Sequence, residues 1–470
     1  MWEYGIVHLI IVLTAYFSFG WLYGTIALIV FVYCADLVLM KCGYTRLTYG
    51  DLCMSYELPN GNHNAGGYFI IEKLDFKTME HEIYNRAIKN IPKLHTILVR
   101  RFGLSFWKHI DMELAKKQVI QVKQKMNTEK ECLKYVETIL NEHMDRDKPL
   151  WEMRLLEDYD EKHSVIFVRL HHAITDGGGY VSLMSCINDD KYKFKSNKTF
   201  PKPNIFVDFV MTIICPFHTI FFLAQYSFLK SSPDARKIGE LKGPDTHKNK
   251  YYVSEEIDFD AVRKCYKRFE KTSFNDYIMG IITISMNEWF KNYGHMKAEK
   301  ILSCITVNLR GMPDSMQDLI LDNKSGAVKF ELPIKENLED GIKACRKSFR
   351  RFFTNWIMVS FSKFCSAIQF FPQKLIMYIL QNFYSSIDLM YSNVPFPSEG
   401  WHFCNKKAVS IKTFANIQHN WKYFFIVTTF RGKIALSSVA NENLKMDPQK
   451  LIDIAIRNLK EEIATHAKSD

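Results

Sequence analysis

The run His171-His172-Ala-Ile-Thr-Asp176-Gly177 places two histidines and a carboxylate directly before further glycines. The residues before it, 163–170, are mostly β-branched or apolar and predict a buried strand, and the apolar segment 180–187 predicts a helix. The histidines are therefore expected at a strand end, where side chains are both held and accessible. A neutral imidazole there can remove a hydroxyl proton while the oxygen attacks a thioester, so the run predicts acyl transfer.

This chemistry also needs a group that fixes the tautomer of the base. Asp176 could do so directly, or it could hold the loop by pairing with a distant arginine, and the spacing leaves both roles open. A metal-binding histidine pair is disfavoured because no further ligand cluster has suitable spacing, and a purely structural strand end is the other alternative. No serine or cysteine has the setting of an activated nucleophile, so a covalent acyl-enzyme is not expected.

HHAITDG resembles the HHxxxDG signature of the chloramphenicol-acetyltransferase-like, CoA-dependent acyltransferase superfamily, which includes the condensation domains of peptide synthetases. Five further segments, in matching order over about residues 50–465, resemble motifs of the wax ester synthase/diacylglycerol acyltransferase family. In the last of these motifs, the SNVPGP box, Phe396 replaces a glycine of the family, which adds bulk and bears on the width of the substrate site. Pro149-Leu150-Trp151 is similar to the PLW motif of that family, and Asn275-Asp276 is similar to its ND motif. Val307-Asn308-Leu309-Arg310 is similar to a strand of the family that ends in arginine, and Asp322-Asn323-Lys324-Ser325-Gly326 stands where the family has a GN pair. Ser392-Asn393-Val394-Pro395 is similar to the SNVPGP box.

The resemblance implies an α/β fold of the α+β type with mixed sheets. Two chloramphenicol-acetyltransferase-like domains would pack as a pseudo-dimer around a tunnel. The apolar N-terminal sequence adds the expectation of a membrane anchor before them. Together with composition, this predicts a membrane-anchoring segment over 1–45, an N-terminal acyltransferase domain over 46–200, an apolar segment and crossover linker over 201–255, and a C-terminal acyltransferase domain over 256–470.

The resemblance also implies roles for individual residues. His172 would be the general base for direct transfer in a ternary complex, His171 would support it, and Asp176 would order the loop with Arg310 as its candidate partner. Candidate donors to the tetrahedral intermediate are Asn275, Ser392 and the backbone N–H of Gly177. The other motif residues are expected to bind substrate or support the site: Pro149, Trp151, Asp276, Asn323 and Asn393, the first two in the tunnel wall.

Composition fits a large enzyme that meets a membrane. The chain has 470 residues, 47% of them apolar, and its net charge of +11 is spread in short groups that suit the phosphates of CoA and an anionic bilayer rather than nucleic acid. Its 11 cysteines form no CxxC pair, which indicates a reducing compartment without disulfides.

Three apolar stretches predict membrane contact. From Tyr4 to Met40 only His8 and Asp36 could carry charge. The stretch is longer than one crossing of a roughly 30 Å hydrocarbon core requires, so a hairpin broken near Gly20 fits better than one helix, although both remain open. The basic residues that follow predict a cytosolic catalytic part, at the endoplasmic reticulum or a lipid droplet. Residues 205–229 predict an interfacial helix pair broken at Pro216. Residues 352–384 predict helices against a membrane or over a tunnel, and ordinary buried helices are the alternative.

Together these observations predict a membrane-bound O-acyltransferase. It would move a long-chain acyl group from acyl-CoA, a co-substrate, to a fatty alcohol or a diacylglycerol, giving wax ester or triacylglycerol. No other cofactor and no metal are expected. The alternatives are a catalytically silent lipid-binding or lipid-droplet protein of the same fold, a condensation domain, which the anchor opposes, and a hydrolase.

Overall fold

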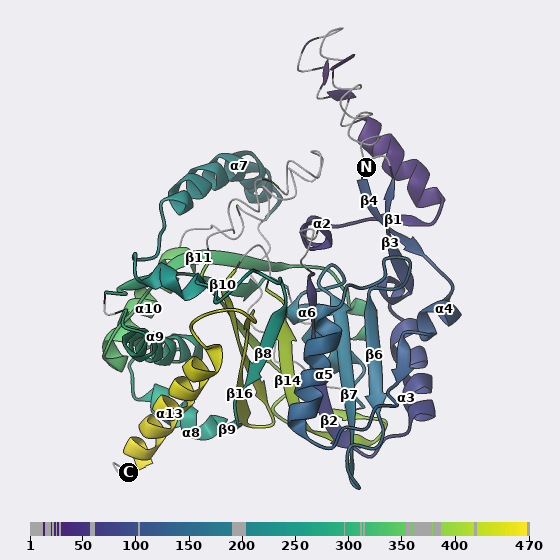
Figure 1. Cartoon of the computed structure of the whole chain (residues 1–470). Coiled ribbons are helices and arrows are strands. Elements are labelled where there is room, and N and C mark those ends of the chain that lie inside the picture. The colour runs from purple at the N-terminus through teal and green to yellow at the C-terminus, as the bar shows by residue number, and fades with distance from the viewer. Residues whose placement is uncertain are drawn as a thin grey trace.

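Two mixed sheets with flanking helices form the body of the protein (Figure 1). The computed structural model describes residues 30–56, 62–101, 104–189, 204–295, 297–310, 315–353, 387–417 and 421–467, together with a few isolated positions.

The first sheet carries the strand that leads to the histidine pair. This strand, β7, is buried along nearly its whole length, which explains its continuous apolar sequence. All neighbouring strands are antiparallel except β5 and β6, which are parallel. The strand order is β13 (His402–Phe403), β14 (Lys406–Ala415), β2 (Asn64–Glu72), β7 (His163–His171), β6 (Trp151–Leu156) and β5 (Val119–Gln121), and the accompanying helices are α3 (Phe76–Ile83), α4 (Met112–Lys116), α5 (Glu129–Asn141) and α6 (Gly177–Cys186).

The second sheet has a parallel centre, because β12 lies parallel to both β10 and β15, and antiparallel edges. Helix α9 packs against α10 and α13, and its buried face contributes Trp289 and Phe290 to the core of this half. The strands are β11 (Ser325–Pro333), β10 (Lys300–Asn308), β12 (Leu389–Pro395), β15 (Tyr423–Phe430), β16 (Lys433–Asn441) and β8 (Asn249–Val253), with β9 (Ile257–Asp258) also on β16, and the helices are α8 (Phe259–Lys267), α9 (Phe274–Asn292), α10 (Leu338–Phe353) and α13 (Pro448–Ala467).

An exchanged strand joins the two halves. Residues 402–415 fall in the range expected for the C-terminal domain, yet β14 pairs with β2 in the first sheet. Similarly, β8 falls in the range expected for the linker and pairs with β16. The backbones approach so closely that a Cβ atom on Gly67 would lie 1.9 Å from the carbonyl oxygen of Lys412. The cavity described below is therefore built from segments that are far apart in the sequence.

A small peripheral sheet carries the end of the N-terminal segment. Its strands are β1 (Tyr44–Arg46), β4 (Leu104–His109) and β3 (Thr96–Arg101), and α2 (Tyr49–Ser55) follows β1. The helical residues 30–41 pack Val32 and Leu39 against this sheet, and Arg46 forms a 2.7 Å ion pair with Asp36. The opposite side of the helix leaves Tyr33 and Val38 exposed.

Most of the predicted anchor, up to residue 29, lies outside the described residues, as does most of the third apolar stretch, 352–384. Within the described part of the chain, no helix has the length and apolar character that a membrane crossing requires. The second stretch forms one helix, α7 (Ile205–Ser227), so the predicted break at Pro216 is wrong. A proline removes only one backbone hydrogen bond, which a long helix can accommodate without ending.

Candidate active site

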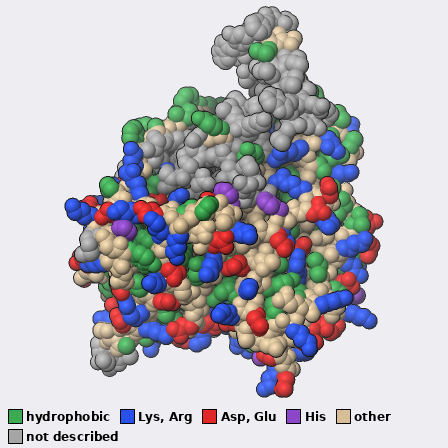
Figure 2. Space-filling model, viewed as in Figure 1, with side chains coloured by type: hydrophobic (Ala, Val, Ile, Leu, Met, Phe, Trp, Pro, Cys, Tyr) green, Lys and Arg blue, Asp and Glu red, His purple; other side chains and the backbone are tan. Residues whose placement is uncertain are grey.

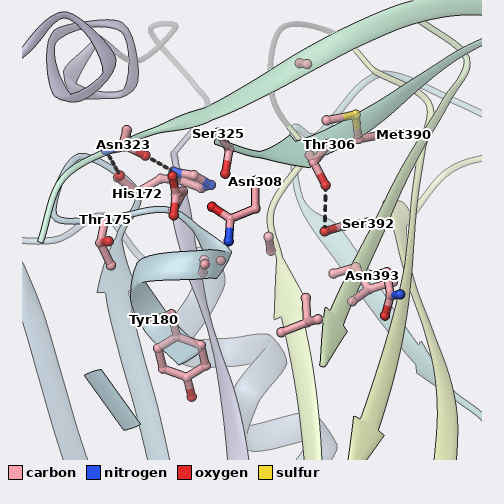
Figure 3. Close-up of a pocket in the computed structure, with 18 of the residues that line it drawn as sticks. His172, Thr175, Tyr180, Thr306, Asn308, Asn323, Ser325, Met390, Ser392 and Asn393 are labelled. Carbon is pink, nitrogen blue, oxygen red and sulfur yellow. Dashed lines mark hydrogen bonds between the residues drawn. The ribbon is translucent and has the colours of Figure 1, made fainter. Parts of the chain in front are cut away.

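A cavity of about 440 Å³ lies where the end of β7 faces the second sheet. Residues from α2, α6, β10, β11, β12 and the exchanged strand β14 line it, and Figure 3 shows how several of them lie. Polar side chains include His172, Asn275, Thr306, Asn308, Asn323, Ser325 and Ser392, and apolar ones include Leu170, Ile305, Met390, Trp421, Phe424 and Ile426.

His172 follows the last residue of β7 and lines the cavity. Its backbone N–H donates to the carbonyl of His63 at 2.7 Å, and its Nδ1 lies 2.9 Å from Oδ1 of Asn323. The Asn323 amide nitrogen donates to the His172 carbonyl at 2.8 Å and to Oδ1 of Asp51 at 2.9 Å. The His172 carbonyl and the Asp51 carboxylate can only accept hydrogen bonds, so the amide nitrogen of Asn323 must face them and the amide oxygen must face the imidazole.

The tautomer of His172 follows from this geometry. Because Asn323 Oδ1 accepts, Nδ1 carries the proton and Nε2 keeps its lone pair. Burial lowers the pKa of His172, and the opposing effects of the Asp176 charge and the Asn323 hydrogen bond do not cancel it. The imidazole is therefore neutral near pH 7, as a general base requires.

His171 has a different environment. Its side chain is buried, it does not line the cavity, and its Nδ1 accepts the backbone N–H of Ala173 at 3.1 Å. Its own backbone N–H donates to the carbonyl of Leu150. The first histidine thus fixes the turn from which the second extends.

Asp176 forms the N-cap of α6. Its Oδ1 accepts from the N–H of Gly179 at 2.9 Å and from Arg310 Nη2 at 2.7 Å, and its Oδ2 accepts the N–H of Lys324 at 2.7 Å. Burial alone would raise the pKa of Asp176, but the Arg310 charge and the Gly179 N–H lower it, so the carboxylate stays ionised. The pairing with Arg310 that the motif order predicted is confirmed.

Of the three glycines after Asp176, Gly179 has the least space. A Cβ atom there would lie 1.8 Å from Thr175 Oγ1 and 2.7 Å from Arg310 Nη1. At Gly177, which lines the cavity, the nearest atom would be Val394 Cγ2 at 3.9 Å. The sequence singled out Gly177, whereas close packing requires Gly179.

Asn275 and the SNVP segment meet on the opposite wall of the cavity. Asn275 Oδ1 accepts from the Tyr391 hydroxyl at 3.1 Å and from Asn393 Nδ2 at 3.0 Å. Thr306 donates to Ser392 Oγ at 3.0 Å (Figure 3). Asn275, Ser392 and Asn393 all line the cavity, so the structure brings these residues together with His172.

Asp276, Trp151 and Pro149, which were expected to bind substrate or support the site, lie away from the cavity. Asp276 forms a capping box with Ser273 at the start of α9. Trp151 is buried in the core and donates through Nε1 to the carbonyl of Leu94 at 2.7 Å. Pro149 precedes β6 and is also buried. Neither Pro149 nor Trp151 is among the described residues that form the cavity wall.

Phe396 does not narrow the cavity. Its side chain is buried and makes edge contacts with the rings of Phe69, Tyr180 and Phe430, at centroid distances of 5.9 to 6.4 Å. It is not among the lining residues, and its φ lies outside the left-handed region. The bulk that replaces glycine is therefore placed in the core.

Sequence reasoning missed Asp51 and Asn308. Asn308 lines the cavity and accepts the N–H of Arg310 at 3.1 Å, and its position within the VNLR segment was a usable signal. Asp51 lies before the first motif, and nothing in the local sequence marks it as part of a site. Cys53 also lines the cavity, but burial raises the pKa of its thiol to about 12, so it is not an activated nucleophile.

Two mixed sheets that share an exchanged strand give this chain the fold of two-domain, chloramphenicol-acetyltransferase-like acyltransferase structures. Family models narrow this class. The wax ester synthase/diacylglycerol acyltransferase catalytic domain matches residues 125–205, and the C-terminal domain of the same family matches residues 321–462. The chain therefore resembles the wax ester synthase/diacylglycerol acyltransferase family, and it is an acyl-CoA-dependent O-acyltransferase.

Individual relatives have low sequence identity to this chain but align over most of its length. Wax ester synthase/diacylglycerol acyltransferase 1 of Arabidopsis thaliana is 22% identical over 457 residues, which cover 86% of this chain and 92% of the relative. The O-acyltransferase WSD of Acinetobacter baylyi is 18% identical and covers 71% of this chain and 77% of its own.

Solved structures agree in fold. The wax ester synthase/diacylglycerol acyltransferase of Marinobacter aquaeolei has a TM-score of 0.60 at 14% identity, covering 90% of this chain and 100% of its own. A trichothecene 15-O-acetyltransferase of Fusarium sporotrichioides has a TM-score of 0.62 at 11% identity, covering 89% and 95%. A rhizomide synthetase starter condensation domain, solved with C8-CoA, has a TM-score of 0.59 at 12% identity, covering 91% and 95%.

Proposed function

We propose that this protein transfers a long-chain acyl group from acyl-CoA to the hydroxyl of a lipid alcohol, giving wax ester, triacylglycerol or both. The observation that carries the proposal is the His172–Asn323 hydrogen bond, which leaves an unprotonated Nε2 on a residue that lines the cavity. Aliphatic and aromatic side chains such as Met390, Phe424 and Ile426 form much of the wall, which suits long acyl and alkyl chains.

The proposed reaction is a direct transfer in a ternary complex. His172 Nε2 takes the hydroxyl proton as the alcohol oxygen forms a bond to the thioester carbonyl carbon. The tetrahedral intermediate then breaks its C–S bond, and the imidazolium returns the proton to the CoA thiolate. The products are an ester and free CoA, and the base is restored without a covalent acyl-enzyme.

Two donors on the opposite wall support the negative charge of this intermediate. Thr306 donates to Ser392 Oγ, so the Ser392 hydroxyl keeps its own hydrogen for a partner in the cavity. Asn275 uses its oxygen to accept from Tyr391 and Asn393, which leaves its amide nitrogen as a donor. We assign the oxyanion to these two groups, because fixed donors stabilise developing charge without reorganisation.

We also propose that the protein works at a lipid surface, at the endoplasmic reticulum or a lipid droplet, with the catalytic part cytosolic. Helix α7 supports this, since it exposes large apolar side chains that water disfavours. Figure 1 shows α7 and the helical residues 30–41 at the same end of the molecule, on either side of α2, and Figure 2 shows hydrophobic side chains along this edge. The exposed side chains of α7 include Ile205, Phe206, Phe209, Ile213, Ile214, Phe217, Ile220 and Phe221.

The test is ester formation by membranes that carry the protein, with labelled long-chain acyl-CoA and with hexadecanol and diacylglycerol offered together. We expect labelled ester from the wild type and its loss in a folded His172→Ala variant. The labelled product identifies the acceptor. Absence of ester with either alcohol from a folded, membrane-bound wild type would contradict the proposal and favour the silent lipid-binding alternative.

A further inference from the structure

A buried ion pair lies next to the Asn323 amide that holds His172. Lys93 Nζ donates to Asp51 Oδ2 at 2.6 Å, and the two side chains are only 13% and 2% exposed. Asp51 lies in the first turn of α2, and Lys93 lies in the short turn before β3. Neither lines the cavity or takes part in the proposed proton transfers. Since burying two charges costs desolvation energy, such a pair is weak evidence for a role in stability alone.

Asp51 holds the backbone and the side chain of one residue. Its Oδ1 accepts from the backbone N–H of Asn323 at 3.0 Å and from Asn323 Nδ2 at 2.9 Å. Helix α2 also touches this segment directly, because a Cβ atom on Gly50 would lie 2.1 Å from the Asn323 carbonyl oxygen. Lys93 Nζ donates to the other carboxylate oxygen and lies 4.9 Å from the centre of the Trp107 ring. The position of the Asp51 carboxylate is therefore fixed by Lys93.

The orientation of the Asn323 amide decides which nitrogen of His172 is the base. Two acceptors, Asp51 Oδ1 and the His172 carbonyl, face the amide nitrogen and direct the amide oxygen to His172 Nδ1. Without Asp51, one of these two acceptors is lost and the amide can turn. A turned amide would present N–H to Nδ1 and select the tautomer that carries its proton on Nε2, which cannot accept a proton.

We propose that Asp51, supported by Lys93, is a positioning residue that locks the Asn323 amide and thereby keeps Nε2 of His172 unprotonated in the cavity. This inference rests on the proposed function, in which His172 is the base. It assigns a role to a segment that precedes every motif of the family resemblance. The base from the first sheet thus depends on an amide before β11 and on a carboxylate from α2.

The experiment compares two isosteric variants, Asp51→Asn and Asp51→Asn with Lys93→Met. In the single variant the Lys93 charge attracts the new amide oxygen, so an NH2 group faces the N–H groups of Asn323 and the lock is lost. In the double variant the amide is free to turn its oxygen to Asn323, and the lock is restored without any charge. We expect kcat to fall about 10- to 100-fold in the single variant, with KM for acyl-CoA within about two-fold, and to recover to within about three-fold in the double variant.

A pH profile separates positioning from general damage. The Asn323 hydrogen bond favours the imidazolium of His172, so its loss lowers the pKa of His172 and moves the acid limb of kcat/KM to lower pH. The other groups that face His172, Asp176 and His171, are unchanged in these variants. General damage would lower the rate at every pH and leave the limb in place. The control is Lys73→Met with Asp158→Asn, an exposed ion pair of similar length, 2.7 Å, which should leave the activity unchanged.

The inference is overturned if Asp51→Asn keeps the wild-type kcat and acid limb while His172→Ala abolishes ester formation. Unaltered ester formation by His172→Ala would instead overturn the proposed function. If Asp51→Asn does not fold, Asp51→Ala with Lys93→Met removes the acceptor and leaves no buried charge. We expect that variant to show the same loss of kcat, and wild-type kcat would again overturn the inference.

Discussion

Asp176 and Arg310 join the two halves of the enzyme beside His172, with Arg310 Nη2 2.7 Å from Asp176 Oδ1 and both side chains nearly inaccessible to solvent. Asp176 caps α6 in the first half, and Arg310 follows β10 in the second. Arg310 also donates to the carbonyl of Asp322, and Asp176 accepts from Lys324, so the residues on both sides of Asn323 are fixed. The aspartate of the HHxxxDG run therefore acts through the loop that carries Asn323, not by a hydrogen bond to the imidazole.

Replacing Arg310 with methionine should lower both stability and rate, because Asp176 would keep a buried charge without its partner. Removing one member of a buried pair costs about 3 to 5 kcal/mol. Chemical denaturation and the ester assay would measure the two effects. The matched control is Arg310→Met with Asp176→Asn, which leaves no unpaired charge and should recover part of the stability. A single variant as stable as the wild type would contradict this role of the pair.

The glycines of the run should differ in their tolerance of alanine. Gly179→Ala places a methyl group against Thr175 Oγ1 and Arg310 Nη1, so we expect a loss of about 1 to 3 kcal/mol and much reduced ester formation. Gly177→Ala meets nothing closer than 3.9 Å and should keep most of the stability. Thermal unfolding of the two variants tests this directly, and equal midpoints would show that the packing around Gly179 is not limiting.

Activity should rise with pH through a midpoint below the ordinary histidine pKa of 6.5 and be level at pH 7, since burial lowers the pKa of His172. The free energy of unfolding should also rise with pH in this range. Between the folded and unfolded pKa values the unfolded chain binds more protons, so the contribution of His172 to stability is present above about pH 6.5 and is lost as the pH falls towards the folded value. The pH dependence of kcat/KM measures the midpoint, and an acid limb above pH 7 would contradict this assignment.

Substituting Phe206, Phe209 and Phe217 with serine should weaken binding to phospholipid vesicles while the fold is kept. These side chains are 63 to 73% exposed on α7, so their removal takes little from the core. Flotation with anionic vesicles would measure the bound fraction, and Leu114→Ser, which removes an exposed leucine from α4, is the control. If the triple variant floats as the wild type does, α7 is not the lipid contact.

The local parts of this enzyme could be predicted from the amino-acid sequence alone. The apolar run of β7, the glycines that open α6 and the histidine pair between them follow from near-neighbour patterning, because a strand, a turn and a helix start each depend on a few adjacent residues. Six motifs in matching order indicated the family resemblance and predicted that Arg310 pairs with Asp176. The predicted break at Pro216 is wrong, because a proline removes one backbone hydrogen bond and the remaining bonds of a long helix hold its two parts together.

How these parts contact one another depends on the three-dimensional packing of the chain. The placement of β14 in the first sheet, the burial of Phe396 in the core and the contact between Asp51 and Asn323 all join segments that are distant in the chain. Such contacts depend on packing and on the orientation of single side chains, which local sequence does not encode. The tautomer of His172, and with it the capacity for general-base catalysis, is set by this long-range geometry.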